Sequence, residues 1–420
     1  MGRDRLKESD SIILTLEETL EDQKDLKQLC TDRPLETNEI YWLNAVYGFN
    51  WIVKKYANLP YDEPLKAVIP HGIYLTEDVI IDPDATADLP VILCRSLHEY
   101  RGYQKLIMKY GFNKLVLYSA CPFLYVVELL KQSPKPDRKG TIFFLPHSTP
   151  YMTLQTDLEA LAEELENLEE KYQPITVCAY WSDFNLGHHL PFQQRGFNIV
   201  SAGHMYDPKF LFRFYHLCSL HRYSTSNSLG SHLFYSIKSR CSYFHLDKIP
   251  CAYQTEEPNQ QEYIDKWSLV EENSNLPSLF KFPPPDLATE QTKIADYYLG
   301  TDYFKSPDEL RHQLNQAKLL YEMDLRPELH LSQYQLHTTR IELQEAQEQL
   351  KNVQFELEKT QEQSKKIHNG LQNTQVQLQQ NQAQLQQAQD IITGMKSSKF
   401  WKLRERWFEL KRAIGLESSK

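Results

Sequence analysis

A turn rich in serine and asparagine lies between a strand-like and a helix-like run at residues 224–237 (STSNSLGSHLFYSI). A helix that begins near Ser231 leaves its first backbone N–H groups without intrahelical partners. Residues Asn227, Ser228 and Gly230 can bring further N–H and hydroxyl groups to the same place. These donors predict a site for a phosphate or a diphosphate. Serine and asparagine also cap many helices that bind nothing, so a plain capping turn is the alternative.

Three further segments end in polar residues directly after an apolar run, and each adds candidates for the same site. The candidates are His147, Ser148 and Thr149, then Trp181, Ser182 and Asp183, then Gly203 and His204, and His232 in the turn above. Taken singly, such residues often only satisfy a turn. In an open parallel sheet, however, the carboxyl ends of the strands share one edge, so these side chains would line one pocket. Hydroxyl and N–H groups there would hold a nucleotide diphosphate, and a histidine would stabilise charge on the departing phosphate.

The order of elements indicates an α/β protein with two Rossmann-like domains. Residues 138–315 alternate apolar strands with helices, which is typical of a parallel, doubly wound sheet. Residues 36–137 contain three similar strand-like runs, KAVIPHGIYL, DLPVILCRS and NKLVLYSA. A helical lead (1–35) precedes them, and a Pro/Lys/Gly-rich linker, KQSPKPDRKG, joins the two blocks. Two such domains in tandem predict a cleft between them.

Residues 316–396 predict a coiled coil. Leucine recurs every seven residues, and the residues three positions further on complete a heptad seam. A glutamine-rich disordered tail is the alternative. The seam makes a homo-oligomer the expected assembly, although leucine at one position and mixed residues at the other do not select its strand number.

Residues 397–420 abandon the heptad phase and predict a basic amphipathic helix. Its apolar stripe is bordered by lysine and arginine, which suits the surface of an anionic membrane. Docking on the globular part or on a partner helix is the alternative.

Composition narrows the function classes. The 420 residues are 41% apolar and carry a net charge of −10, which argues against nucleic acid as the main partner. The start of the chain lacks the apolar core of a signal peptide, and the longest apolar stretch, 115–130, falls short of a bilayer span. Seven scattered cysteines show no metal-ligand spacing and are typical of a reducing compartment. We therefore expect a cytoplasmic protein, held peripherally at the inner membrane face if its tail binds lipid.

Four segments together resemble a known family. In this order and spacing, FFLPHSTPYMT, ITVCAYWSD, GFNIVSAGHMYDPKFL and TSNSLGSHLFYSI are similar to the nucleotide-binding half of GT-B glycosyltransferases from bacterial capsule and surface polysaccharide clusters. The resemblance extends over 140–247 and is weaker over 36–137. It implies a nucleotide-sugar donor on the second domain, a glycan or lipid-linked glycan acceptor in the cleft, and no cofactor or metal at the reaction centre.

The resemblance also assigns roles to residues. Ser228, Gly230, Ser231 and His232 would meet the donor diphosphate, while His147 and Ser148 would lie near the donor. This sequence departs from the family where a Gly-Lys-Pro turn usually follows the helix, because Ser239, Arg240 and Cys241 stand there. This departure affects which contacts the nucleotide would make.

A transferase needs a base for the acceptor hydroxyl, and His71 is the candidate. It follows a predicted strand of the first domain in AVIPHG, with Gly72 allowing a close turn, although a structural turn histidine is an equal alternative. Glu77, Asp78 and Glu99 are weaker candidates. Asp82 and Asp84 in IIDPDAT could form a carboxylate pair for a metal, as in the metal-dependent GT-A transferases. Pro83 fixes a turn there, however, and the two-domain pattern argues against that class.

Two other functions fit the same pattern. A nucleotide-sugar 2-epimerase would share the fold but needs acids and bases that the sequence does not favour. A non-catalytic coiled-coil scaffold in a polysaccharide assembly complex is the alternative from another class, and the altered Ser-Arg-Cys turn leaves room for it.

Overall fold

The structure, a computed structural model, describes residues 12–131, 137–149, 152–256, 261, 264–266, 276–280, 289–323 and 331–414. Parts of the predicted helical lead, linker and C-terminal segment lie outside the described residues. The chain divides into two compact units, Met1–Leu331 and Ser332–Lys420, and each is described by itself.

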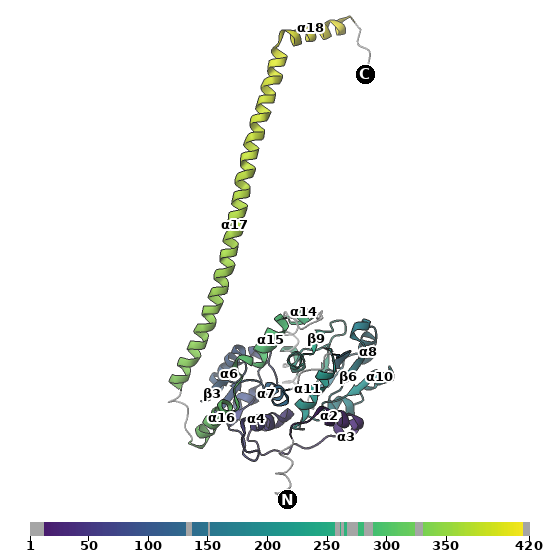
Figure 1. Cartoon of the computed structure of the whole chain (residues 1–420), viewed down its shortest axis with the longest axis vertical. Coiled ribbons are helices and arrows are strands. Elements are labelled where there is room, and N and C mark those ends of the chain that lie inside the picture. The colour runs from purple at the N-terminus through teal and green to yellow at the C-terminus, as the bar shows by residue number, and fades with distance from the viewer. Residues whose placement is uncertain are drawn as a thin grey trace. The chain divides into compact units, whose positions relative to one another are not determined.

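A five-stranded parallel sheet forms the larger half of the first unit (Figure 1). Its order is β7-β6-β4-β8-β9, and its strands are β4 (Thr141–Phe144), β6 (Ile175–Cys178), β7 (Asn198–Val200), β8 (Tyr223–Ser226) and β9 (Ser242–His245). All four residues of β4, β6, β8 and β9 are buried, as expected for parallel strands that helices cover on both faces. The expectation of an α/β fold with a parallel sheet is confirmed.

A smaller parallel sheet of three strands precedes it in the chain. Its order is β1-β2-β3, with β1 at Ala67–Val68, β2 at Val91–Cys94 and β3 at Leu115–Tyr118. A separate antiparallel pair joins β5 (Thr153–Leu154) to β10 (Tyr253–Gln254).

Helices surround these sheets. Those of the first unit are α2 (Leu16–Asp22), α3 (Leu26–Leu29), α4 (Phe49–Ala57), α5 (Asp82–Thr86), α6 (Leu97–Tyr110), α7 (Pro122–Leu130), α8 (Leu158–Glu166), α9 (Trp181–Asn185), α10 (Leu190–Gln194), α11 (Phe210–Leu220), α12 (Ser231–Lys238), α14 (Leu276–Phe280), α15 (Thr289–Leu299) and α16 (Pro307–Glu322). Short 3₁₀ helices lie at Gln23–Asp25, Trp42–Gly48, Glu77–Val79, Glu170–Tyr172 and Thr301–Tyr303.

The two sheets share one hydrophobic core. Helix α7 supplies much of the shared packing, since the ring of Phe123 stacks on Tyr235 of α12 at 4.3 Å and meets Phe214 of α11 edge-on at 6.0 Å. Core residues from both sheets, such as Leu93 and Phe144, belong to the same buried cluster. Contacts therefore group all residues up to Leu331 into one unit, and the division into two domains stays a prediction.

The first and last segments of this unit pack on different halves of it. Arg213 of α11 donates to Asp22 at 2.6 Å, so the helical lead packs on the large sheet's side. Helix α16 instead packs against α4 and β1 and buries Leu310, Leu314 and Leu320. The boundary predicted between residues 315 and 316 thus falls inside a helix of the globular core.

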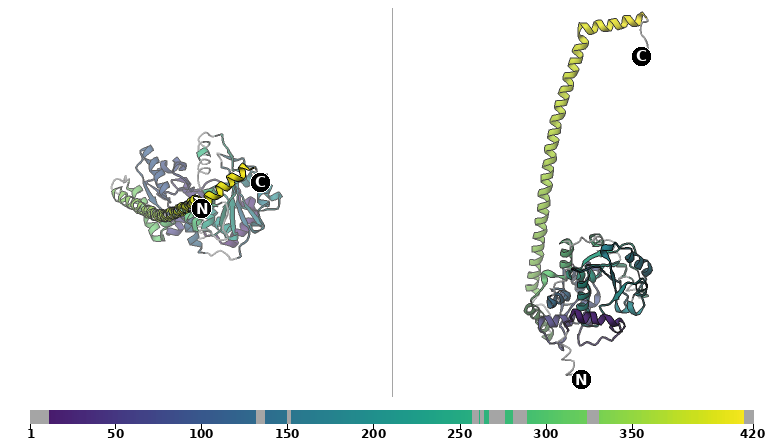
Figure 2. Two further views of the ribbon diagram at one scale, coloured as in Figure 1. Left: turned by 90° about the horizontal axis from the view of Figure 1, so that it is seen from above. Right: turned by 45° about the vertical axis from the view of Figure 1, so that its right-hand side comes forward.

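The second unit is helical (Figures 1 and 2). Helix α17 runs without interruption from Leu331 to Ser397, and α18 runs from Lys399 to Ala413. Seam leucines whose exposure is described, Leu357, Leu371, Leu378 and Leu385, are each more than half exposed. The long helix agrees with the predicted heptads. That α17 pairs with a second copy in a coiled coil stays a prediction. Among the described residues, no helix is both long and apolar enough to cross a bilayer.

Candidate ligand-binding site

The strand order of the large sheet reverses between β4 and β8. From β4 the chain moves to β6 and then β7 on one side, whereas β8 and β9 lie on the other. Such a reversal opens a crevice beyond the carboxyl ends of the two central strands, where α/β sheets bind ligands. His147 comes three residues after β4, and the Ser/Asn/Gly turn follows β8. Two of the predicted groups therefore flank this switch point.

Helix α12 begins shortly after β8, at the switch point, and no side chain caps its N-terminus. Its N-cap, Gly230, has extended backbone angles and makes no side-chain capping bond. A β-carbon at this glycine would lie 3.1 Å from Nδ1 of His232, so a larger residue would press on that ring. With no capping side chain, the first amides of α12 are placed to meet an anion.

His147 lies within electrostatic range of two other histidines, His71 and His232. The pKa of each of these two is lowered, first by burial and also by His147. Burial is the larger cause in each case, and it lowers the pKa of His232 to about 3. Both rings are therefore neutral at pH 7, when one ring nitrogen can accept a proton.

Buried polar atoms near the crevice have no hydrogen-bond partner within the described part of the chain. They are Nδ1 of His71, Nε2 of His232 and Oδ1 of Asn227, whose Nδ2 donates to the carbonyl of Ile249 at 3.0 Å. Buried polar atoms are normally satisfied, so unsatisfied ones call for an explanation such as a water or a ligand. Asn227 and His232 flank the open end of α12 in the sequence, whereas His71 belongs to the small sheet's half.

A hydrogen bond joins the small sheet's half to α12. Oγ of Ser231 accepts from the backbone N–H of Ile73 at 3.2 Å, two residues after His71. This bond holds the segment after β1 that carries His71 against the first turn of α12. Of the predicted site residues, Ser231 and His232 lie on that turn, His71 lies two residues before Ile73, and His147 influences the pKa of both His71 and His232.

Ser148 and Thr149 have structural roles at the end of β4. The backbone N–H and the hydroxyl of Ser148 each donate to Asp183 at 2.8 Å, and Nδ1 of His188 contacts the same carboxylate at 2.8 Å. Ser148 also accepts from the amide of Leu154, so its hydroxyl is fully engaged. The backbone of Thr149 pairs with Met152. Ser148 therefore positions the loop that carries His147.

His204 belongs to a different neighbourhood. It follows β7, the edge strand, and is fully buried against Trp181 at 4.1 Å. Its Nε2 meets Asp32 at 3.2 Å, and its Nδ1 accepts from the amide of Tyr206. Both ring nitrogens are satisfied, so these contacts tie the N-terminal segment to the sheet edge.

Ser228 remains at the turn itself. Its amide and hydroxyl both lie 3.3 Å from Oγ of Ser226, and its carbonyl accepts from the hydroxyl of Tyr243. The turn is thus fixed by its own hydrogen bonds beside α12.

The carboxylates considered as alternative bases are engaged elsewhere. Glu99 accepts three bonds from the Arg95 side chain, the closest at 2.7 Å, and one from its backbone N–H. Glu77 pairs with Lys105, and Asp78 is exposed. Sequence reasoning missed Arg95, a buried cation directly after β2 that also donates to the carbonyl of Gly72. Its spacing of four residues from Glu99 on α6 was the available signal.

Asp82 and Asp84 do not face a common point. Asp84 is fully buried and accepts hydroxyls from Tyr41, Tyr74 and Tyr103 at 2.5, 2.8 and 2.7 Å. Asp82 accepts from Tyr110 near the surface. The two carboxylates therefore stabilise the packing around α5.

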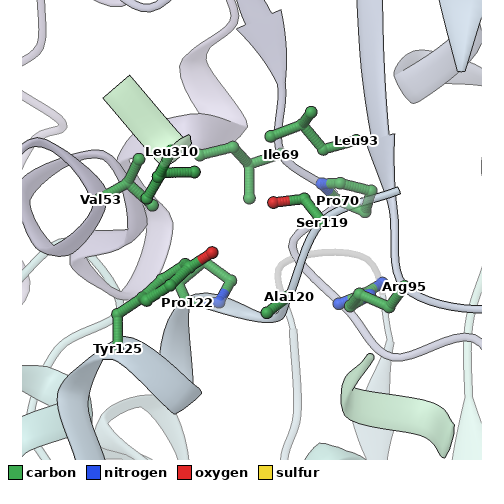
Figure 3. A pocket seen from close by; sticks show the side chains of 10 residues that line it. All are labelled: Val53, Ile69, Pro70, Leu93, Arg95, Ser119, Ala120, Pro122, Tyr125 and Leu310. Atoms are coloured by element: carbon green, nitrogen blue, oxygen red, sulfur yellow. The ribbon is translucent and has the colours of Figure 1, made fainter. Parts of the chain in front are cut away.

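A small cavity among the described residues lies beyond the small sheet (Figure 3). It has room for about one water molecule and is lined by Val53, Ile69, Pro70, Leu93, Arg95, Ser119, Ala120, Pro122, Tyr125 and Leu310. A second cavity lies where residues 54–66 meet α16. Neither is lined by His147, Ser228 or His232, so the predicted donor pocket corresponds to neither cavity.

Comparisons with known proteins add little to this geometry. No protein family and no curated protein matches the chain. A solved structure, the crystal structure of the GtfA/B complex, is similar over 65% of this chain and 55% of that chain, so the match spans about half of its length. The sequence identity is 10% and the TM-score is 0.30. A superposition this loose carries no argument about fold or function.

Proposed function

We propose that this chain is a glycosyltransferase that moves a sugar from a nucleotide-sugar donor to a glycan or lipid-linked glycan acceptor. The observation that supports this proposal is the uncapped start of α12 at the topological switch point, where Ser231 bonds the segment that carries His71 and Nε2 of His232 has no partner among the described residues. Nucleotide ligands characteristically bind at such a point, with their phosphates at a helix N-terminus.

The roles follow from the chemistry of each group. The first amides of α12, with the hydroxyls of Ser228 and Ser231, would hold the donor diphosphate. The unpartnered Nε2 of His232 would take up a proton when the phosphate binds, because a neighbouring negative charge raises the pKa of the ring, and would then donate to a phosphate oxygen and stabilise its charge as the sugar leaves. This assignment uses protein donors alone and needs no metal.

His71 would act as the general base. Its pKa is lowered by burial, so its ring is neutral and its unpartnered Nδ1 can take the proton of an acceptor hydroxyl. The acceptor oxygen would attack the anomeric carbon as its proton moves to Nδ1. The bond from that carbon to the diphosphate would break, and the nucleoside diphosphate would leave with the electron pair.

Ligand screening of the full chain tests this proposal. UDP-, CMP- and GDP-sugars are added separately, and thermal stability and donor hydrolysis are followed. We expect one nucleotide class to raise the melting temperature and to be hydrolysed slowly. Ser231→Ala should weaken that effect, whereas Ser236→Ala, the same change further along α12, should retain it. A chain that responds to no nucleotide sugar would contradict the proposal.

A scaffold role is the second candidate, and α17 is the observation that favours it. Its 67 residues form an uninterrupted helix whose exposed leucines would be buried by pairing with a second copy. Self-association is compatible with either function, so nucleotide binding decides between them. A 2-epimerase would also bind the donor but would release an epimerised nucleotide sugar, which product analysis distinguishes.

A further inference from the structure

The C-terminal helix α18 carries an apolar surface that nothing in the described part of the chain covers. Phe400 is 83% exposed, Leu403 72%, Trp407 58%, Leu410 57% and Ile414 60%. A contiguous exposed apolar surface of this kind marks an interaction site. The surface is independent of the switch point and of the function proposed for it.

Pairing of α17 cannot cover this surface in the heptad register. The chain leaves helical geometry at Ser398, whose hydroxyl caps α18 by accepting from the amide of Trp401 at 3.3 Å. Continued from Ile392 and Met395, the heptad seam would next place Lys399 and Lys402 in its core. Two lysines at successive core positions end a coiled coil, so α18 begins as a separate element.

The apolar and charged residues of α18 are sorted around its axis. At about 100° per residue, the five exposed apolar residues fall within an arc of about 80°. Arg406 and Lys399 border one side of this arc, and Lys411 and Arg404 border the other. The two acidic residues, Glu405 and Glu409, lie on the opposite face. Lys402 and Arg412 share that opposite face with the acids, so the border of the apolar arc carries cations alone and places positive charge where a lipid headgroup would be.

Aromatic rings reinforce the border. The guanidinium of Arg404 lies 5.2 Å from the ring of Trp401 and 5.5 Å from that of Phe408, and Nζ of Lys411 lies 5.8 Å from that of Trp407. Tryptophan rings favour the boundary between lipid tails and water, and lysine and arginine stems extend from that depth toward the headgroups.

We infer that α18 lies in the surface of an anionic lipid bilayer. Its apolar arc would enter the boundary between headgroups and acyl chains, and its bordering cations would contact lipid phosphates. The helix carries six cationic and two acidic residues, against a net charge of −10 for the whole chain. This contrast gives the anionic surface a specific attraction for one end of the molecule.

Flotation of the full chain with lipid vesicles tests this inference. We expect recovery with phosphatidylcholine vesicles that contain about a third phosphatidylglycerol, and weak recovery with pure phosphatidylcholine or in 0.5 M salt. Trp407→Gln combined with Leu410→Gln removes apolar surface without changing charge and should lower binding at least tenfold. The matched control, Glu405→Gln with Glu409→Gln, changes the opposite face and should bind as well as the unaltered chain or better.

Two results would overturn the inference. One is the absence of binding to anionic vesicles. The other is equal binding by the unaltered chain and by the Trp407→Gln, Leu410→Gln variant. If that variant instead changed the oligomeric mass or the melting temperature in solution, α18 would be shown to cover a protein surface.

Discussion

The two sheets of the globular unit treat the polar groups at their carboxyl ends in opposite ways. Beyond the small sheet, Arg95 and Glu99 form a buried ion pair, and Asp84 receives three tyrosine hydroxyls. Beyond the large sheet, the turn before α12 has no side-chain cap, and Nε2 of His232 has no partner among the described residues. The first edge satisfies its carboxylates internally, although Nδ1 of His71 there has no partner among the described residues; that atom and Nε2 of His232 retain capacity for a ligand.

This difference separates stability from function. A buried polar network whose members satisfy one another adds rigidity, and breaking it lowers the free energy of unfolding. Unsatisfied groups at a switch point contribute little to stability and are available for binding. Substitutions at the two edges should therefore change different measurements.

The largest expected effect is the loss of the buried ion pair. Glu99→Gln leaves the Arg95 guanidinium buried without its counter-charge, so the free energy of unfolding should fall by about 3–5 kcal/mol. Urea denaturation measures this change. Glu77→Gln removes the more exposed pair with Lys105 and should cost less than about 1 kcal/mol. Equal losses in the two variants would show that the Arg95–Glu99 pair is not special.

His71→Gln tests the proposed general base. Removing a general base should lower kcat by about 10²–10⁴-fold with a smaller effect on KM. The melting temperature should stay near that of the unaltered chain. A variant that keeps full turnover would assign His71 to the turn alone.

Gly230→Ala should have a smaller effect, confined to ligand binding. The added β-carbon would press on the His232 ring 3.1 Å away and shift it against the open end of α12. Disturbing one hydrogen bond to a charged phosphate should weaken nucleotide binding about tenfold. Calorimetric titration measures the affinity. Ser236→Ala, further along α12, is the control. Gly196→Ala would not serve, because that glycine has a φ of +84°, which strains any residue with a side chain.

The last prediction concerns acid stability, where the effect is spread over several pH units. The pKa of His232 is lowered to about 3 when folded, while an unfolded histidine titrates near 6.5. Below about pH 6.5 the unfolded chain binds a proton that the folded chain does not, so stability falls as the pH falls toward 3. His232→Asn should flatten this fall by at most about 1.4 kcal/mol per pH unit. Denaturation curves at pH 7, 6 and 5 measure the slope, with exposed His312→Asn as the control.

The elements near the switch point could be predicted because local sequence specifies them. The apolar runs of β4 and β6 each end in polar residues, and the glycine and serines before α12 indicate a helix start. The heptads of α17 are equally local. Short-range patterns of this kind give element types and the positions of turns.

Long-range partners could not be predicted in the same way. The link from Ser148 to Asp183 spans 35 residues, and nothing in either segment names the other. Likewise, the buried face of α16 resembles that of any amphipathic helix, so its packing on α4 was missed. Such pairings depend on how sheets and helices assemble, which a single sequence does not specify.

The hydrogen bond between Ile73 and Ser231 has a consequence for how binding and shape are linked. A hydroxyl can accept one hydrogen bond while it donates another. If the hydroxyl of Ser231 donated a hydrogen bond to a phosphate, the hydroxyl would be polarised and the hydrogen bond that it accepts from the Ile73 amide would become stronger. Ligand and closure would then favour each other, and by thermodynamic reciprocity any change that loosens the two halves would weaken affinity by the same factor.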